Sequence, residues 1–116
     1  MPTPSGTSPD SPTGDADDDR LLEVLARTDE PLRPRRWQHF LYFASLESSA
    51  RQAAASLADA GWEVEILAPI PDSPEWGICA EQDAVITADA IRDARAVMTE
   101  LVRRYGGEYD GWETII

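Results

Sequence analysis

The sequence contains no lysine, and its 10 basic residues, all arginine, stand against 22 acidic ones, which gives a formal net charge of −12. Proteins normally hold nucleic acids by clustering lysine and arginine against the phosphates. A chain this acidic repels phosphate, so its composition argues against direct nucleic-acid binding. It favours a protein partner that carries basic segments.

Cysteine and histidine are equally scarce, with one of each, Cys79 and His39. A lone cysteine forms neither an intramolecular disulfide nor a CxxC metal site, and His39 has no second histidine or cysteine with which to bind a metal. We interpret His39 as structural and Cys79, between Ile78 and Ala80, as a small buried hydrophobe. Phosphate-binding glycine loops and nucleophile elbows are also missing. The sequence therefore predicts no catalytic residue, no metal site and no cofactor.

Long hydrophobic runs are absent as well. No stretch is long enough to span a membrane, and the first residues lack the basic start and apolar centre of a signal peptide, so we expect a cytoplasmic protein. Residues 1–19 consist mainly of Pro, Ser, Thr, Gly and Asp, and we expect a disordered acidic tail there. The remaining length suits one domain.

Residues 20–36 are predicted to form a short helix, capped by Asp18 or Asp19, followed by a proline- and arginine-rich connector. Residues 37–116 then alternate between the two hydrophobic periods. Trp62, Val64 and Ile66, for example, alternate with glutamates as in a half-buried strand. The predicted order is a strand over 37–44, a helix from Ser45 to Gly61, strands over 62–66 and 76–81, a helix from Thr87 to Gly106, and a strand over 108–116.

This order of elements predicts an α+β fold of the ferredoxin-like βαββαβ type. Right-handed crossovers turn it into a four-stranded antiparallel sheet with two helices on one face, preceded by the short N-terminal helix. The opposite face of the sheet is left open. The N-terminal helix, a partner, or a second copy of the chain could cover it.

The most distinctive motif is the run from Gly107 to Glu113, which reads Gly-Glu-Tyr-Asp-Gly-Trp-Glu. It resembles the EYDGW signature that closes the domain of the ribonuclease E inhibitor B family (RraB-like proteins). The Leu-rich helix over 20–28, a Gly-Trp-Glu-Val passage at 61–64 similar to the family's GYEV, and a cysteine-containing third strand agree in order. The resemblance covers residues 20–116. It differs in the acidic tail, which here is N-terminal and in the best-known members is C-terminal.

The resemblance implies a non-enzymatic, bacterial regulatory protein that binds and inhibits a ribonuclease E/G-type endoribonuclease and thereby modulates RNA decay. One alternative is a small-ligand sensor or general protein-interaction module of ferredoxin-like fold. Another is a hydrolase or isomerase, which would need a pocket where a carboxylate and His39 converge. Glu63 and Glu65, which share one face of a strand, are better explained as a solvated face than as an acid and base pair.

The signature run is the predicted partner-binding site. Asp110 and Gly111 suit a tight bend or bulge. Tyr109 and Trp112 offer large apolar faces with polar tips, as protein-contact anchors do, although both rings could instead belong to the core, and for Trp112 we favour the core. The full set of candidate residues is Glu108, Tyr109, Asp110, Gly111, Trp112 and Glu113.

Overall fold

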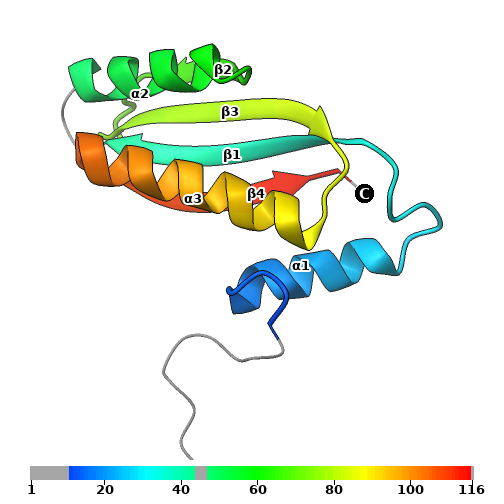
Figure 1. Ribbon diagram of the computed structural model, residues 1–116. Coiled ribbons are helices and arrows are strands. Elements are labelled where there is room, and N and C mark those ends of the chain that lie inside the picture. The colour runs from blue at the N-terminus through cyan, green and yellow to red at the C-terminus, as the bar shows by residue number, and fades with distance from the viewer. Residues whose placement is uncertain (1–10, 44–46, 116) are drawn as a thin grey trace, which may run out of the picture.

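The computed structural model describes residues 11–43 and 47–115. Within these ranges lie three helices and four strands, whose arrangement can be followed in Figure 1. The elements in chain order are α1 (Ala16–Ala26), β1 (Arg35–Phe43), α2 (Glu47–Asp59), β2 (Glu63–Leu67), β3 (Trp76–Ala84), α3 (Ala88–Tyr105) and β4 (Gly107–Thr114). After α1, this is the predicted order of strand, helix, strand, strand, helix, strand.

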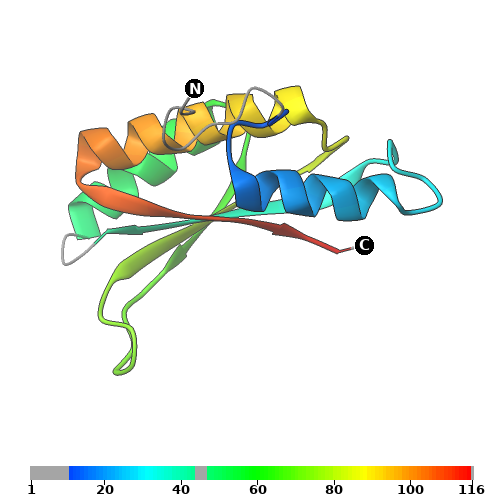
Figure 2. The same cartoon turned by 90° about the horizontal axis from the view of Figure 1, so that it is seen from below.

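The four strands form one antiparallel sheet in the order β2-β3-β1-β4. The predicted hairpin of the second and third strands is confirmed by the pairing of β2 with β3. Figures 1 and 2 show α2 and α3 side by side on one face of the sheet. The predicted α+β class and antiparallel sheet are therefore confirmed.

The core lies between the sheet and these two helices. Along β1, every second residue is buried against the helices, including Leu41 and Phe43, because successive side chains of a strand point to opposite faces. The facing helices bury one stripe each. The stripe of α2 is mostly alanine, which lets its backbone approach the sheet closely. The buried helical residues are Ala50, Ala53, Ala54 and Leu57 of α2, and Ile91, Ala94, Met98 and Leu101 of α3.

The ends of α3 are as predicted. The Thr87 hydroxyl accepts a hydrogen bond of 3.1 Å from the backbone N–H of Ala90, which satisfies one free donor of the first turn. Gly106 ends the helix in the left-handed conformation, with a φ of 75°. The cap predicted at Ser45 lies outside the described residues.

The N-terminal helix begins earlier than predicted. It starts at Ala16, and its cap is Asp15 rather than Asp18 or Asp19. The expectation of a disordered tail over 1–19 is therefore wrong for residues 11–19, while residues 1–10 lie outside the described part. The physical reason is that Asp19 accepts hydrogen bonds from the Ser11 hydroxyl at 2.5 Å and the Thr13 backbone N–H at 3.0 Å. A segment rich in Asp, Ser and Thr here builds a helix start.

The α1 helix lies on the same side of the sheet as α2 and α3, beside β4 (Figure 2). Its Leu25 packs in a second apolar cluster with Trp37, Ile91 and Trp112. The helix-free face of the sheet is thus left uncovered by the described residues. Of the three candidates for covering this face, α1 is therefore excluded. No helix in the described ranges has the length and apolar character required to cross a membrane.

The predicted irregularity at Asp110 and Gly111 is a β-bulge. His39 pairs with Trp112 and Leu41 pairs with Tyr109, so Asp110 and Gly111 together stand opposite the single residue Phe40. Gly111 has a φ of +97°, a conformation that L side chains rarely adopt. The bulge thereby brings Tyr109 and Trp112 to the same face of the sheet.

Gly111→Ala should destabilise the protein, because a Cβ at this positive φ is strained by about 1–2 kcal/mol even though open space surrounds it. Denaturant unfolding monitored by tryptophan fluorescence would measure the loss. Asp110→Ala, one residue away and with an ordinary φ, is the matched control and should leave the free energy of unfolding within about 0.5 kcal/mol. Equal stability of the two variants would contradict the strained geometry of the bulge.

Candidate functional site

The signature strand β4 divides its side chains between the protein interior and solvent. Trp112 is buried and Tyr109 is half-buried, and both point toward the helices. Glu108, Asp110 and Glu113 are exposed. The structure therefore places the two aromatic residues of the predicted contact set in the fold itself, and leaves the three carboxylates available to a partner.

Trp112 ties β4 to α1. Its indole N–H donates a hydrogen bond of 2.9 Å to Oδ1 of Asp18, although the two residues lie far apart in the sequence. The indole ring packs edge-on against Trp37, with ring centroids 5.8 Å apart, and 8% of the residue is exposed. An indole buried in this way needs a partner for its N–H, and Asp18 supplies it. The expectation that Trp112 belongs to the core is confirmed.

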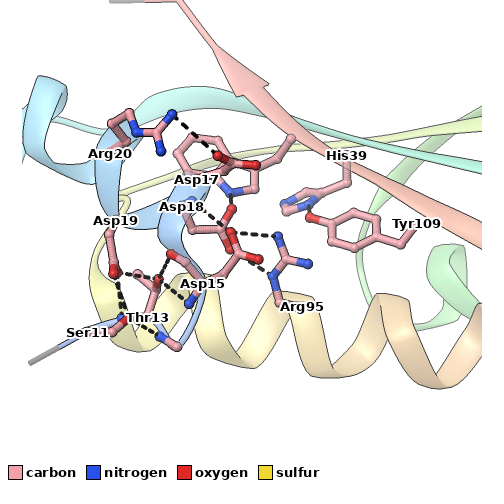
Figure 3. Close-up of polar contacts among 12 residues, drawn as sticks. Ser11, Thr13, Asp15, Asp17, Asp18, Asp19, Arg20, His39, Arg95 and Tyr109 are labelled. Carbon is pink, nitrogen blue, oxygen red and sulfur yellow. Dashed lines mark hydrogen bonds and ion pairs between the residues drawn. The ribbon is translucent and has the colours of Figure 1, made fainter. Parts of the chain in front are cut away.

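Asp18 also holds Arg95 of α3 (Figure 3). Nε of Arg95 donates to Oδ2 of Asp18 at 2.8 Å, and the Asp18 side chain is 3% exposed. Its negative charge is buried with a positive partner and two hydrogen bonds, the condition under which a charge is tolerated inside a protein. The same ion pair raises the pKa of Arg95 above its ordinary value, chiefly through the hydrogen bond to Asp18.

The cluster continues from Arg95 through Tyr109 to His39. The Arg95 guanidinium carbon lies over the Tyr109 ring, 5.1 Å from its centroid, in a cation–π arrangement. The Tyr109 hydroxyl and Nδ1 of His39 share a hydrogen bond of 2.7 Å. Burial, and secondarily the charge of Arg95, lowers the pKa of His39 to about 3, and burial raises the pKa of Tyr109. Both groups are therefore neutral at physiological pH.

A shallow hollow of about 340 Å³ lies where α1, α3 and β4 meet, and Asp15, Asp17, Arg95 and Asp110 are among the residues that line it. His39 does not line this hollow. Among the described ranges, no group of three or more His, Cys, Asp and Glu side chains is arranged to hold a metal ion.

Sequence reasoning named Asp18 only as a candidate helix cap and did not single out Arg95. Asp18 belongs to a run of three aspartates, and only the fold shows which of them turns inward. Arg95 follows Ile91 by four residues and precedes Met98 by three, so its position on the edge of the apolar stripe of α3 was a signal that could have been used.

The fold and this cluster together define a small α+β domain in which an N-terminal helix is fixed to the last strand through buried polar contacts. A family model described as "RraB: Regulator of ribonuclease activity B" matches residues 15–114. The chain belongs to this family, which is described as a regulator of ribonuclease activity. The match begins at Asp15, the cap of α1, so it includes the helix that Asp18 holds. No curated protein matches the chain.

Asp18→Ala should lower the free energy of unfolding by about 3 kcal/mol, because it leaves the Trp112 N–H and the Arg95 guanidinium without their buried acceptor. Asp17→Ala is the matched control. Asp17 directly precedes Asp18, and its carboxylate is exposed. Its ion pair with Arg20 at 3.6 Å lies on the surface and contributes little to the free energy of unfolding. Urea unfolding of both variants measures the difference, and similar losses would contradict the structural role of Asp18.

Stability should fall as the pH is lowered from 7 to 5. The pKa of His39 is lower in the folded state than in the unfolded state, so the unfolded chain binds more protons in this range and acidification favours unfolding. With an unfolded pKa near 6.5, the loss is about 2 kcal/mol. His39 is the only histidine, so His39→Gln should flatten the profile between pH 5 and 7. A wild-type profile that is already flat there would refute the buried, neutral imidazole.

Proposed function

We propose that this protein regulates a ribonuclease E-type endoribonuclease by binding it and lowering its activity, without performing any chemistry of its own. The family match over residues 15–114 carries the proposal. Inhibition would arise when the protein occupies a scaffold or RNA-binding segment of the ribonuclease. Because such an enzyme acts in the bacterial cytoplasm, we place the protein there as well.

The charge distribution supports a basic segment as the contact on the ribonuclease. The chain has a net charge of −12, and the signature strand exposes Glu108, Asp110 and Glu113. Complementary charge accelerates association and disfavours wrong partners. Segments that bind RNA are rich in arginine and lysine. The acidic surface of this protein would therefore compete with RNA for the arginine and lysine residues of the ribonuclease.

We also infer that the domain is ferredoxin-like in the full sense. Counted from the β4 edge, the strands follow the order 4-1-3-2, and β1 and β3 occupy the centre. Both crossover helices, α2 and α3, pack on the same face. This arrangement supports the split βαβ architecture, in which one sheet face stays free for interactions.

The test is to measure binding and RNA cleavage with a purified ribonuclease E-type enzyme from the same cell. Asp110→Ala should weaken binding several-fold and leave the melting temperature unchanged, because an exposed rim charge affects association more than folding. Asp59→Ala, which removes an exposed carboxylate from the far end of α2, is the control. Affinity should also fall when the salt concentration is raised above about 0.1 M.

The proposal fails if the wild-type protein neither binds the ribonuclease nor slows cleavage. If it binds with an affinity that is indifferent to salt, the acidic surface has no part in recognition. If Asp110→Ala unfolds the domain and leaves the residual binding intact, the signature serves folding alone.

A further inference from the structure

The face of the sheet that faces away from the helices is strongly acidic. Strand register assigns side chains to this face, because residues directly opposite each other on neighbouring strands point the same way. Gln38 on β1 pairs with Glu81 on β3 and with Glu113 on β4, and β2 pairs in turn with β3. The carboxylates placed on this open face are Glu63, Glu65, Glu81, Asp83, Glu108 and Glu113.

Arg36 is the one guanidinium that the same register places among these carboxylates in the described strands, and it is already engaged. It pairs with Glu63 at 2.5 Å, with Glu81 at 2.7 Å and with Asp83 at 3.5 Å. These contacts neutralise one corner of the face. Within the described part of the chain, the remaining three carboxylates, Glu65, Glu108 and Glu113, form no ion pair.

The thiol of Cys79, near the centre of the open face, reports the same excess of negative charge. Its pKa is raised to about 11, first by burial and the hydrogen bond to Glu81, and then by the charges of Glu81, Glu65 and Glu113. Three carboxylates on three different strands thus act on one central atom. A cation placed over this region would be attracted by all three at once.

The open face also offers apolar surface. Phe40 lies beside Cys79 in the register, and Tyr42 packs on Gly77, where an added Cβ would come within 3.2 Å of the Tyr42 ring. Toward the β2–β3 turn a groove of about 460 Å³ is lined by Tyr42, Leu67 and Ile70, with Glu65 and Glu75 at its sides. Ile70 is 59% exposed. Apolar surface bordered by charge of one sign is typical of a protein-contact site.

We propose that the open face is the docking surface for an arginine- or lysine-rich segment of the partner protein, with apolar or aromatic residues of that segment seated in the groove at Tyr42, Leu67 and Ile70. The proposal rests on the proposed function in taking the ribonuclease as the partner. Charge complementarity selects the occupant. RNA would bring phosphates against six carboxylates, and a second copy of the chain would bring six more carboxylates, so both are repelled.

Two triple variants separate this surface from general acidity. Glu65→Gln, Glu108→Gln and Glu113→Gln remove three charges from the open face. Asp29→Asn, Asp59→Asn and Asp93→Asn remove three exposed charges that lie outside the open face. These residues lie after α1, on α2 and on α3, respectively. Both variants have the same net charge, so long-range attraction changes equally. The probes are a fluorescent twelve-residue peptide of alternating Arg with Leu and Trp, its citrulline analogue, and the ribonuclease itself.

We expect the open-face triple variant to bind the Arg peptide at least tenfold more weakly than wild type at about 0.1 M salt. The affinity of the control triple variant for this peptide should change less than threefold. The citrulline analogue should bind neither variant. The ribonuclease should show the same order. Binding of the Arg peptide without binding of the ribonuclease would support the surface and reject the proposed partner.

Three results would overturn the proposal. The first is equal weakening by the two triple variants, which would reduce recognition to net charge. The second is binding of single-stranded RNA, or a concentration-dependent dimer in sedimentation, that the open-face triple variant abolishes. The third is no binding of the Arg peptide by wild type. Far-UV circular dichroism and melting curves of both variants establish that they are folded, since all six substituted side chains are exposed.

Discussion

The carboxylate of Asp18 is the contact on which the arrangement of the site depends. It accepts hydrogen bonds from Trp112 on β4 and Arg95 on α3, so one buried side chain joins α1 to the last helix and the last strand of the chain. Arg95, held by this bond, lies over Tyr109, and Tyr109 in turn meets His39 in the sheet. A buried polar cluster of this kind is satisfied only in one geometry, so it fixes the orientation of α1 more specifically than apolar packing of Leu25 alone would.

The signature run combines inward-facing aromatic residues with exposed carboxylates in a few positions of β4. The bulge at Asp110 and Gly111 adds one residue to β4, and this extra residue brings both Tyr109 and Trp112 to the helix side. Without it, strict alternation would send residues three apart to opposite faces. The carboxylates that remain outside are therefore displayed on a strand whose position is set by its aromatic neighbours. In the proposed function, recognition depends on the same segment as folding, but through different side chains.

Most of the fold could be predicted because its signals are local. The alternation of Trp62, Val64 and Ile66, the cap at Thr87 and the stop at Gly106 each act within a few residues, and each element appears where its pattern indicated. The start of α1 could not be predicted in the same way. Asp17, Asp18 and Asp19 are identical in type, yet the first is exposed, the second is buried and the third accepts bonds from Ser11 and Thr13. Asp18 is distinguished from its neighbours by its contacts with β4 and α3, and local propensity contains no information about such contacts.

Charges are compensated on the helix side of the sheet and largely uncompensated on the open side. This difference favours the open side as the proposed recognition surface. On the helix side, the half-buried guanidinium of Arg95 compensates the buried carboxylate of Asp18, and the pKa of His39 is lowered so that the imidazole carries no charge. On the open side, Arg36 compensates one corner and leaves the rest of the carboxylates solvated. Uncompensated surface charge contributes little to folding but creates a field that reaches about a Debye length into solvent. In the proposed function, a basic segment of the partner enters that field before it makes any contact, so the charge that the fold leaves unpaired would raise the rate of association.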